Sequence, residues 1–128
     1  MPRSKPSRVE LTKCETEVMD IVWSKECVTV SDVVDAMDRD LAYTTVMTTF
    51  KILEEKRVIK RGKKIGRAFT YKPLISRDQV REGMLKSLAD QLFGGSTRSL
   101  VLSLINSNAV SPADIEAVKK AAAKLERQ

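Results

Sequence analysis

The chain has 128 residues, 23 lysines and arginines, 17 acidic residues and a formal net charge of +6. This length fits one domain, or one small domain with an appendage. The chain has no histidine and its two cysteines lack a metal-ligand spacing, so neither a cofactor nor a bound metal is expected. Without a nucleophile–base pair, a glycine-rich phosphate loop or a carboxylate cluster, an enzyme is not expected either.

Localisation follows from what the sequence lacks. No apolar run approaches the ~20 residues of a membrane span. The N-terminus does not have the apolar core of a signal peptide. Both features favour a cytoplasmic protein without membrane insertion.

The N-terminal third predicts an arm and two helices. Residues 1–10 carry three cations and two prolines and are expected to be a flexible basic arm, which is either simply disordered or adds a contact to phosphates or the minor groove. Thr12 and Glu15 fit a capping box that opens a first helix. Thr29 and Asp32 fit a second box, which opens a shorter helix. Residues 38–40 are the expected turn.

Residues 41–56 have a helical pattern in which Tyr43, Val46, Phe50 and Leu53 share the inner face. The opposite face is mostly small and hydroxylated, which suits a helix that lies in the major groove of DNA. A threonine can meet a thymine methyl or hydrogen-bond a base edge, and a lysine can donate to guanine. The alternative is that the threonine hydroxyls only approach phosphates. The residues expected to contact DNA from about 42–56 are Ala42, Tyr43, Thr44, Thr45, Met47, Thr48 and Lys51, with the apolar Met47 expected against a thymine methyl or the groove wall.

From position 56 to position 72 there are eight lysines and arginines and no acidic residue. Residues 58–60 and 68–71 are β-prone, and 61–67 is expected to be the loop between them. A basic hairpin directly after the 41–56 helix is typical of a winged helix-turn-helix, whose wing lies on phosphates. The alternative is a basic edge that only prevents aggregation. The expected phosphate contacts are Arg61, Lys63, Lys64 and Arg67.

After position 74 the pattern is purely helical, with capping boxes at Ser76–Gln79 and at Ser111–Asp114. Residues 97–106 are apolar on nearly all sides, and three helices of about 50 residues bury little surface alone. We therefore expect this region to exchange surface with a second copy of the chain. The alternative is packing against its own N-terminal domain. The residues expected in the dimer interface are Val80, Met84, Leu88, Leu92, Leu100, Val101, Leu104, Ile105, Ile115 and Val118.

The predicted fold is thus mainly α with a small β-hairpin wing. It comprises the basic arm at 1–10, a winged helix-turn-helix DNA-binding domain at 11–74, and a three-helix dimerisation domain at 75–128.

Two other functions are weighed against DNA binding by a repressor. A winged helix can also be a protein-interaction module without sequence-specific DNA binding, but interface cores are depleted of lysine, and the predicted wing is rich in lysine. Single-stranded nucleic acid binding normally uses exposed aromatic platforms, and the chain has only one tryptophan, two tyrosines and three phenylalanines.

Several segments resemble the penicillinase-repressor family, the BlaI/MecI/CopY type of bacterial winged-helix repressors. They are LTKCETEVMDIVW, VTVSDVVDAM, LAYTTVMTT, GRAFTYKP, LFGGS, SLVLSLI and SPADIEAVKK, and the resemblance covers about residues 10–125. It implies a homodimer on a palindromic operator in double-stranded DNA that represses β-lactam resistance or related genes. It also implies inactivation through cleavage by a membrane-linked sensor protease, or metal-dependent release in copper-responsive members.

The sequence departs from the family pattern in four features. The usual N-R-L after the TVMT segment is here Lys51-Ile52-Leu53 and the following glycine is Arg57, so a different base preference is expected. The C-x-C pairs of the copper-type members are absent, so the resemblance gives no support for copper sensing. The cleaved members are cut at an Asn-Phe bond, and the corresponding residues here are Ser103 and Leu104. This pair is the candidate cleavage site, although its sequence differs from that of the cleaved bond.

Overall fold

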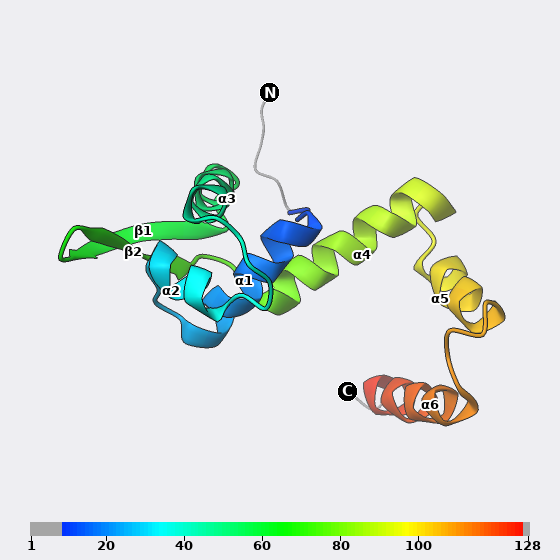
Figure 1. Cartoon of the computed structure of the whole chain (residues 1–128). Helices are drawn as coiled ribbons and strands as arrows, with labels where there is room; N and C mark the ends of the chain where they lie inside the picture. The colour runs from blue at the N-terminus through cyan, green and yellow to red at the C-terminus, as the bar shows by residue number, and fades with distance from the viewer. Residues whose placement is uncertain (1–8, 127–128) are drawn as a thin grey trace. The chain divides into compact units, whose positions relative to one another are not determined.

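A computed structural model of the chain describes residues 9–126 (Figure 1). It contains two compact units, which divide after Leu85. Residues 1–8, most of the expected basic arm, lie outside the described residues. The elements in chain order are α1 (Lys13–Lys25), α2 (Val30–Ala36), α3 (Tyr43–Glu55), β1 (Ile59–Ile65), β2 (Ala68–Pro73), α4 (Arg77–Phe93), α5 (Thr97–Asn106) and α6 (Pro112–Glu126).

Reciprocal capping bonds open four of the helices, as the sequence predicts. In α1, for example, Glu15 N donates to Thr12 Oγ1 at 3.3 Å and Thr12 N donates to Glu15 Oε1 at 3.0 Å. These bonds satisfy two backbone N–H groups that have no partner inside the helix. The same exchange occurs in the pairs Thr29–Asp32, Ser76–Gln79 and Ser111–Asp114.

α3 begins later than the sequence pattern suggests. Its first helical residue is Tyr43, and Ala42 precedes it with an extended backbone. The Tyr43 side chain is 51% exposed, so its assignment to the inner face was wrong. Tyr43 stands at the very start of the helix, one turn before the buried Val46 and two turns before the buried Phe50.

The wing is longer than predicted. β1 pairs antiparallel with β2 from Ile59 opposite Pro73 to Ile65 opposite Ala68, so most of the expected 61–67 loop is strand. The strands are joined by two residues, and the first of these, Gly66, has a φ of +65°. A two-residue hairpin turn requires such a positive φ, which glycine adopts at little cost. The register shifts between Arg61 and Lys64, where Thr70 Oγ1 donates to Lys63 O at 2.6 Å.

A single core joins the elements of the N-terminal unit. Phe50 of α3 lies edge-on to Tyr71 of β2, with ring centroids 4.8 Å apart, and Val28 forms an isolated bridge with Tyr71. Val80 is 5% exposed and belongs to this core, and Met84 packs against it. The first turns of α4 therefore belong to the N-terminal compact unit, which ends after Leu85, whereas the sequence pattern placed the domain boundary at position 74.

The unit from Lys86 onward buries little of its apolar surface. Ala89 and Leu100 are buried, whereas α6 has no buried residue. The large apolar side chains that remain exposed in this unit are Leu88, Leu92, Val101, Leu102, Leu104, Val118 and Leu125.

Across residues 9–126, every helix is too short or too polar to cross a membrane.

Candidate nucleic-acid interface

One face of α3 is buried and the other is open. Val46, Phe50 and Leu53 are fully buried. Thr44, Thr48 and Lys51 are exposed and follow one another at intervals of four and three residues, so they lie in one row along the helix. The structure therefore brings these three expected contact residues together on one face. Ala42, Tyr43 and Thr45 are also exposed at the start of α3.

Met47 differs from the other expected contact residues. Its side chain is half-buried and packs against the core of the N-terminal unit. Packing against the core is therefore enough to explain why an apolar residue stands beside the polar face of α3, and a contact between Met47 and DNA is not needed for that explanation.

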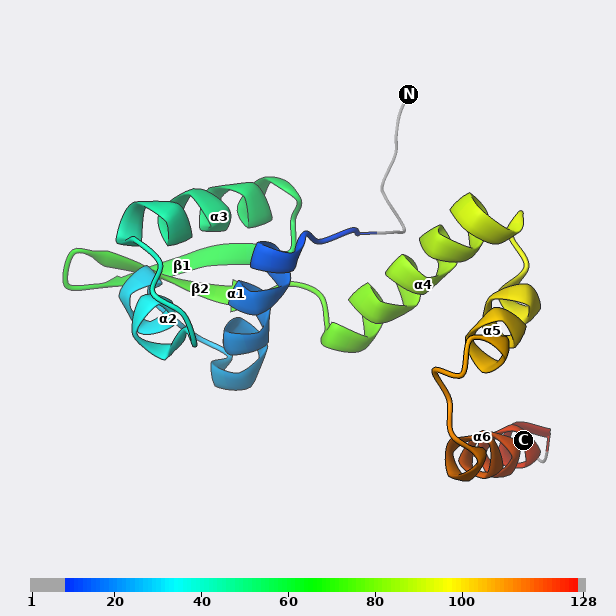
Figure 2. The ribbon, with the colours of Figure 1, turned by 45° about the vertical axis from the view of Figure 1, so that its right-hand side comes forward.

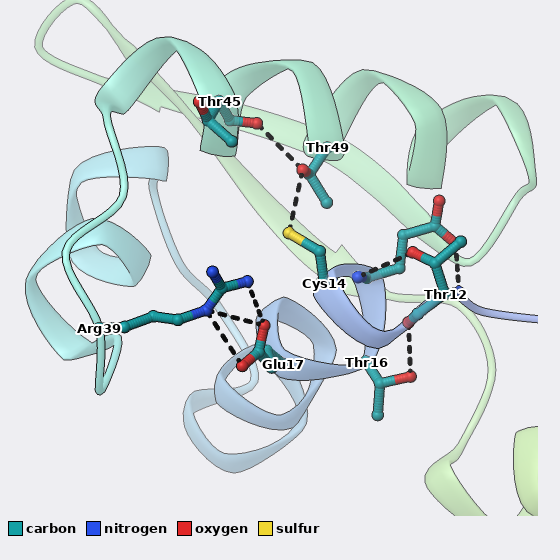
Figure 3. Close-up of polar contacts among 8 residues, drawn as sticks. Thr12, Cys14, Thr16, Glu17, Arg39, Thr45 and Thr49 are labelled. Atoms are coloured by element: carbon teal, nitrogen blue, oxygen red, sulfur yellow. Dashed lines mark hydrogen bonds and ion pairs between the residues drawn. The ribbon is translucent and has the colours of Figure 1, made fainter.

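Threonine hydroxyls on α3 hydrogen-bond to its own backbone. Thr48 Oγ1 donates to Thr44 O at 2.9 Å, and Thr49 Oγ1 donates to Thr45 O at 3.0 Å. The Cys14 sulfur of α1 lies 3.8 Å from Thr49 Oγ1. Because the Thr49 proton is already donated to Thr45, the Cys14 thiol is the donor in this contact. These bonds tie the first turns of α3 to α1 (Figure 3).

The turn between α2 and α3 is held by an ion pair. Arg39 Nη2 donates to Glu17 Oε1 of α1 at 2.8 Å, and Arg39 Nε lies 3.3 Å from both carboxylate oxygens (Figure 3). The hydrogen bonds from Arg39 lower the pKa of Glu17, and those to Glu17 raise the pKa of Arg39. Sequence reasoning missed this pair because no local spacing connects residues 22 positions apart.

A second ion pair holds the other end of α3. Lys56 Nζ donates to Glu15 Oε1 at 2.6 Å and to Glu10 O at 2.9 Å. Glu15 is 5% exposed. Lys56 therefore secures α3 on α1 and on the chain just before it, although the sequence pattern counted it with the wing cations. Val9 also packs against the core, so residues 9–10 are not part of a flexible arm.

The wing cations fall into two groups. Arg61 pairs with Glu54 of α3 at 3.2 Å, and this hydrogen bonding raises the pKa of Arg61. The charged groups of Arg61 and Lys64 also lie 4.7 Å and 4.8 Å from the centre of the Phe69 ring. Lys63 and Arg67 are exposed, and no carboxylate within residues 9–126 forms a salt bridge with either. Lys63 and Arg67 therefore offer positive charge that is not neutralised by an ion pair within these residues.

The wing and α3 run alongside each other. β1 follows α3 in the opposite direction, and the Arg61–Glu54 pair joins the start of the strand to the end of the helix. The hairpin tip extends beyond the end at which α3 begins (Figure 2). The start of α3 and the hairpin tip therefore lie at the same end of the N-terminal unit (Figure 2).

The expected dimer residues are distributed unevenly. Val80 and Leu100 are buried within one copy of the chain, so these two side chains leave little apolar surface for a second copy to cover. Met84, Ile105 and Ile115 are half-buried. The residues that leave apolar surface open are Leu88, Leu92, Val101, Leu104 and Val118. Ser103 and Leu104 of the candidate cleavage site are both exposed on α5.

Comparison with known proteins decides the family. Residues 11–124 match the profile of the penicillinase repressor family. The chain belongs to this family. Transcriptional regulator BlaI of Mycobacterium tuberculosis is 36% identical over 116 residues, which cover 88% of this chain and 82% of that protein. The penicillinase repressor of Staphylococcus aureus is 28% identical over 114 residues, which cover 88% and 90% of the two chains.

A solved structure supports the fold of this family member. The crystal structure of a mutant MarR from E. coli complexed with operator DNA matches with a TM-score of 0.51 and 11% identity, covering 90% of this chain and 75% of that chain. Both the predicted winged-helix fold and the family resemblance are confirmed. The family consists of transcriptional repressors, which confirms that the chain is not an enzyme.

Proposed function

We propose that the chain is a homodimeric, sequence-specific DNA-binding repressor. In this proposal α3 enters the major groove and the β1–β2 wing lies on the phosphates. The observation that carries the proposal is the open row of Thr44, Thr48 and Lys51 on α3, next to a wing that keeps Lys63 and Arg67 exposed. A short polar helix face fits the width of the major groove, and unpaired cations attract the phosphate backbone.

The restraints on α3 support this role. Arg39 holds the turn before the helix to α1, and Lys56 holds its other end to Glu15. A helix fixed at both ends loses little freedom on binding, which favours recognition by a preorganised surface. Relatives named penicillinase repressor, transcriptional regulator and methicillin resistance regulatory protein also support a regulatory role.

The proposed dimer rests on the exposed apolar side chains of the unit from Lys86 onward, such as Leu92, Val101 and Val118. A second copy would remove this surface from water, and two α3 helices related by a two-fold axis would require a palindromic operator. From the family resemblance we propose genes for β-lactam resistance or related functions as targets. The same resemblance suggests a membrane-linked sensor protease as a partner. The bond that corresponds to the cleaved one joins Ser103 and Leu104, a pair that departs from the Asn-Phe of the cleaved members.

The decisive experiment selects bound fragments from genomic DNA and footprints the sites. We expect two half-sites separated by about one helical turn, ~10 base pairs, or by a multiple of it. Lys51→Ala should reduce the ratio of operator to random-sequence affinity by roughly ten- to hundredfold, because one good base contact discriminates by ~1–3 kcal/mol. The matched control is Lys25→Ala. Lys25 is an exposed lysine at the C-terminal end of α1, and its removal should leave this ratio unchanged. One asymmetric site, or full discrimination by Lys51→Ala, would refute the proposal.

A further inference from the structure

The hydroxyl proton of Thr48 is already used inside α3. Thr48 Oγ1 donates to Thr44 O at 2.9 Å, and a threonine in a helix has only two common side-chain rotamers. A hydroxyl has one proton and two acceptor lone pairs. As long as this bond to Thr44 O is kept, Thr48 presents an acceptor oxygen and a methyl group towards the outside and has no donor to offer.

This restricts the groups on DNA that Thr48 can bind. Phosphate oxygens and the O6 and N7 atoms of guanine are acceptors and need a donor. In the major groove, adenine N6 is a donor and thymine carries a C5-methyl group, so an A·T pair presents both features that match Thr48. Cytosine also offers a donor, but its G·C pair has no methyl group.

We propose that Thr48 selects one A·T base pair in each half-site, by accepting a hydrogen bond from adenine N6 and packing its methyl against thymine C5. This inference deepens the proposed function and rests on it. Lys51, three residues further along the same face, has only donors and suits guanine. Because Thr48 offers an acceptor and Lys51 offers donors, the order of the A·T pair and the guanine along the half-site would fix the orientation of α3 in the groove.

The test removes one chemical group at a time from each side of the contact. In the selected operator, thymine is replaced by uracil, which lacks the methyl, and adenine by purine, which lacks the N6 amino group, at each A·T pair of a half-site. The protein variants are Thr48→Val, which keeps the methyl and loses the acceptor, and Thr48→Ser, which keeps the acceptor and loses the methyl. Thr16→Val is the matched control, because Thr16 Oγ1 makes the same kind of bond to Thr12 O, at 2.9 Å, on α1 (Figure 3).

At one A·T pair, the wild type should lose about fivefold in affinity on adenine-to-purine replacement, as for one net hydrogen bond. It should lose about fourfold on thymine-to-uracil replacement, as for one buried methyl. Thr48→Val should no longer distinguish adenine from purine, and Thr48→Ser should no longer distinguish thymine from uracil. Thr16→Val should behave like the wild type.

The experiment distinguishes failure of this inference from failure of the proposed function. If the wild type binds the operator specifically but Thr48→Val still distinguishes adenine from purine at every A·T pair, the inference is overturned and the proposed function stands. If the wild type binds operator and random DNA equally, the proposed function itself fails. A Thr48 variant whose affinity falls equally for operator and random DNA would also overturn the inference, because it would assign Thr48 a structural role.

Discussion

Among single residues, Lys56 makes the ion pair that joins the end of α3 to Glu15 of α1. Its Nζ lies 2.6 Å from Glu15 Oε1, and the Glu15 side chain is 7% exposed. Lys56→Met keeps an apolar stem of similar length but leaves a buried carboxylate without its cation. A hydrogen bond to a charged group contributes about 1.5–3 kcal/mol, so we expect the free energy of unfolding in urea to fall by about 2 kcal/mol.

Lys60→Met is the control for this prediction. Lys60 is exposed on β1, and surface substitutions usually change stability by less than about 0.5 kcal/mol. If both variants were destabilised equally, the ion pair with Glu15 would not be the cause.

Among the elements, the wing combines restrained and unrestrained cations. Lys63→Ala and Arg67→Ala should each lower affinity for operator and random DNA alike, since phosphates are present on any sequence. The slope of log affinity against log salt concentration should shrink by about 0.9 for each phosphate that is no longer neutralised. Arg61→Ala is the matched control: Arg61 is paired with Glu54, so its removal should change the slope less. An unchanged slope in both the Lys63 and Arg67 variants would place the wing away from the phosphates.

For the whole molecule, the boundary between the two units inside α4 predicts how truncated chains behave. A chain ending at Leu85 retains Val80 and Met84, whereas a chain ending at Leu74 lacks the buried Val80. Burying a valine contributes about 1.5–3 kcal/mol, so the shorter chain should be less stable to urea by about 2 kcal/mol.

Sedimentation of the same truncated chains tests the dimer. Both should be monomers that bind a half-site more weakly than the full chain binds its operator. In the full chain, Leu104→Glu should shift the dimer towards monomer, because an unpaired carboxylate is costly to bury. A dimer of the chain ending at Leu85 would contradict the assignment of the interface to the later helices.

The sequence by itself determined the elements and their order. Each capping box depends on two residues three positions apart, such as Thr12 and Glu15, and therefore forms wherever the helix does. The inner face of α3 likewise follows from the spacing of Val46, Phe50 and Leu53. Local spacing of this kind sufficed to predict the winged helix and the exposed row of Thr44, Thr48 and Lys51.

Only the tertiary structure decided what depends on distant partners. The Glu17–Arg39 and Glu15–Lys56 pairs join residues 22 and 41 positions apart, and no local pattern indicates them. Pairing with β2 turned the predicted 61–67 loop largely into strand, because a strand is stabilised by hydrogen bonds to its neighbour. Val80 fits an apolar stripe equally well in an interface or in a core. Its burial in the core of the N-terminal unit was decided by which surface lies against it, a property that helical periodicity does not contain.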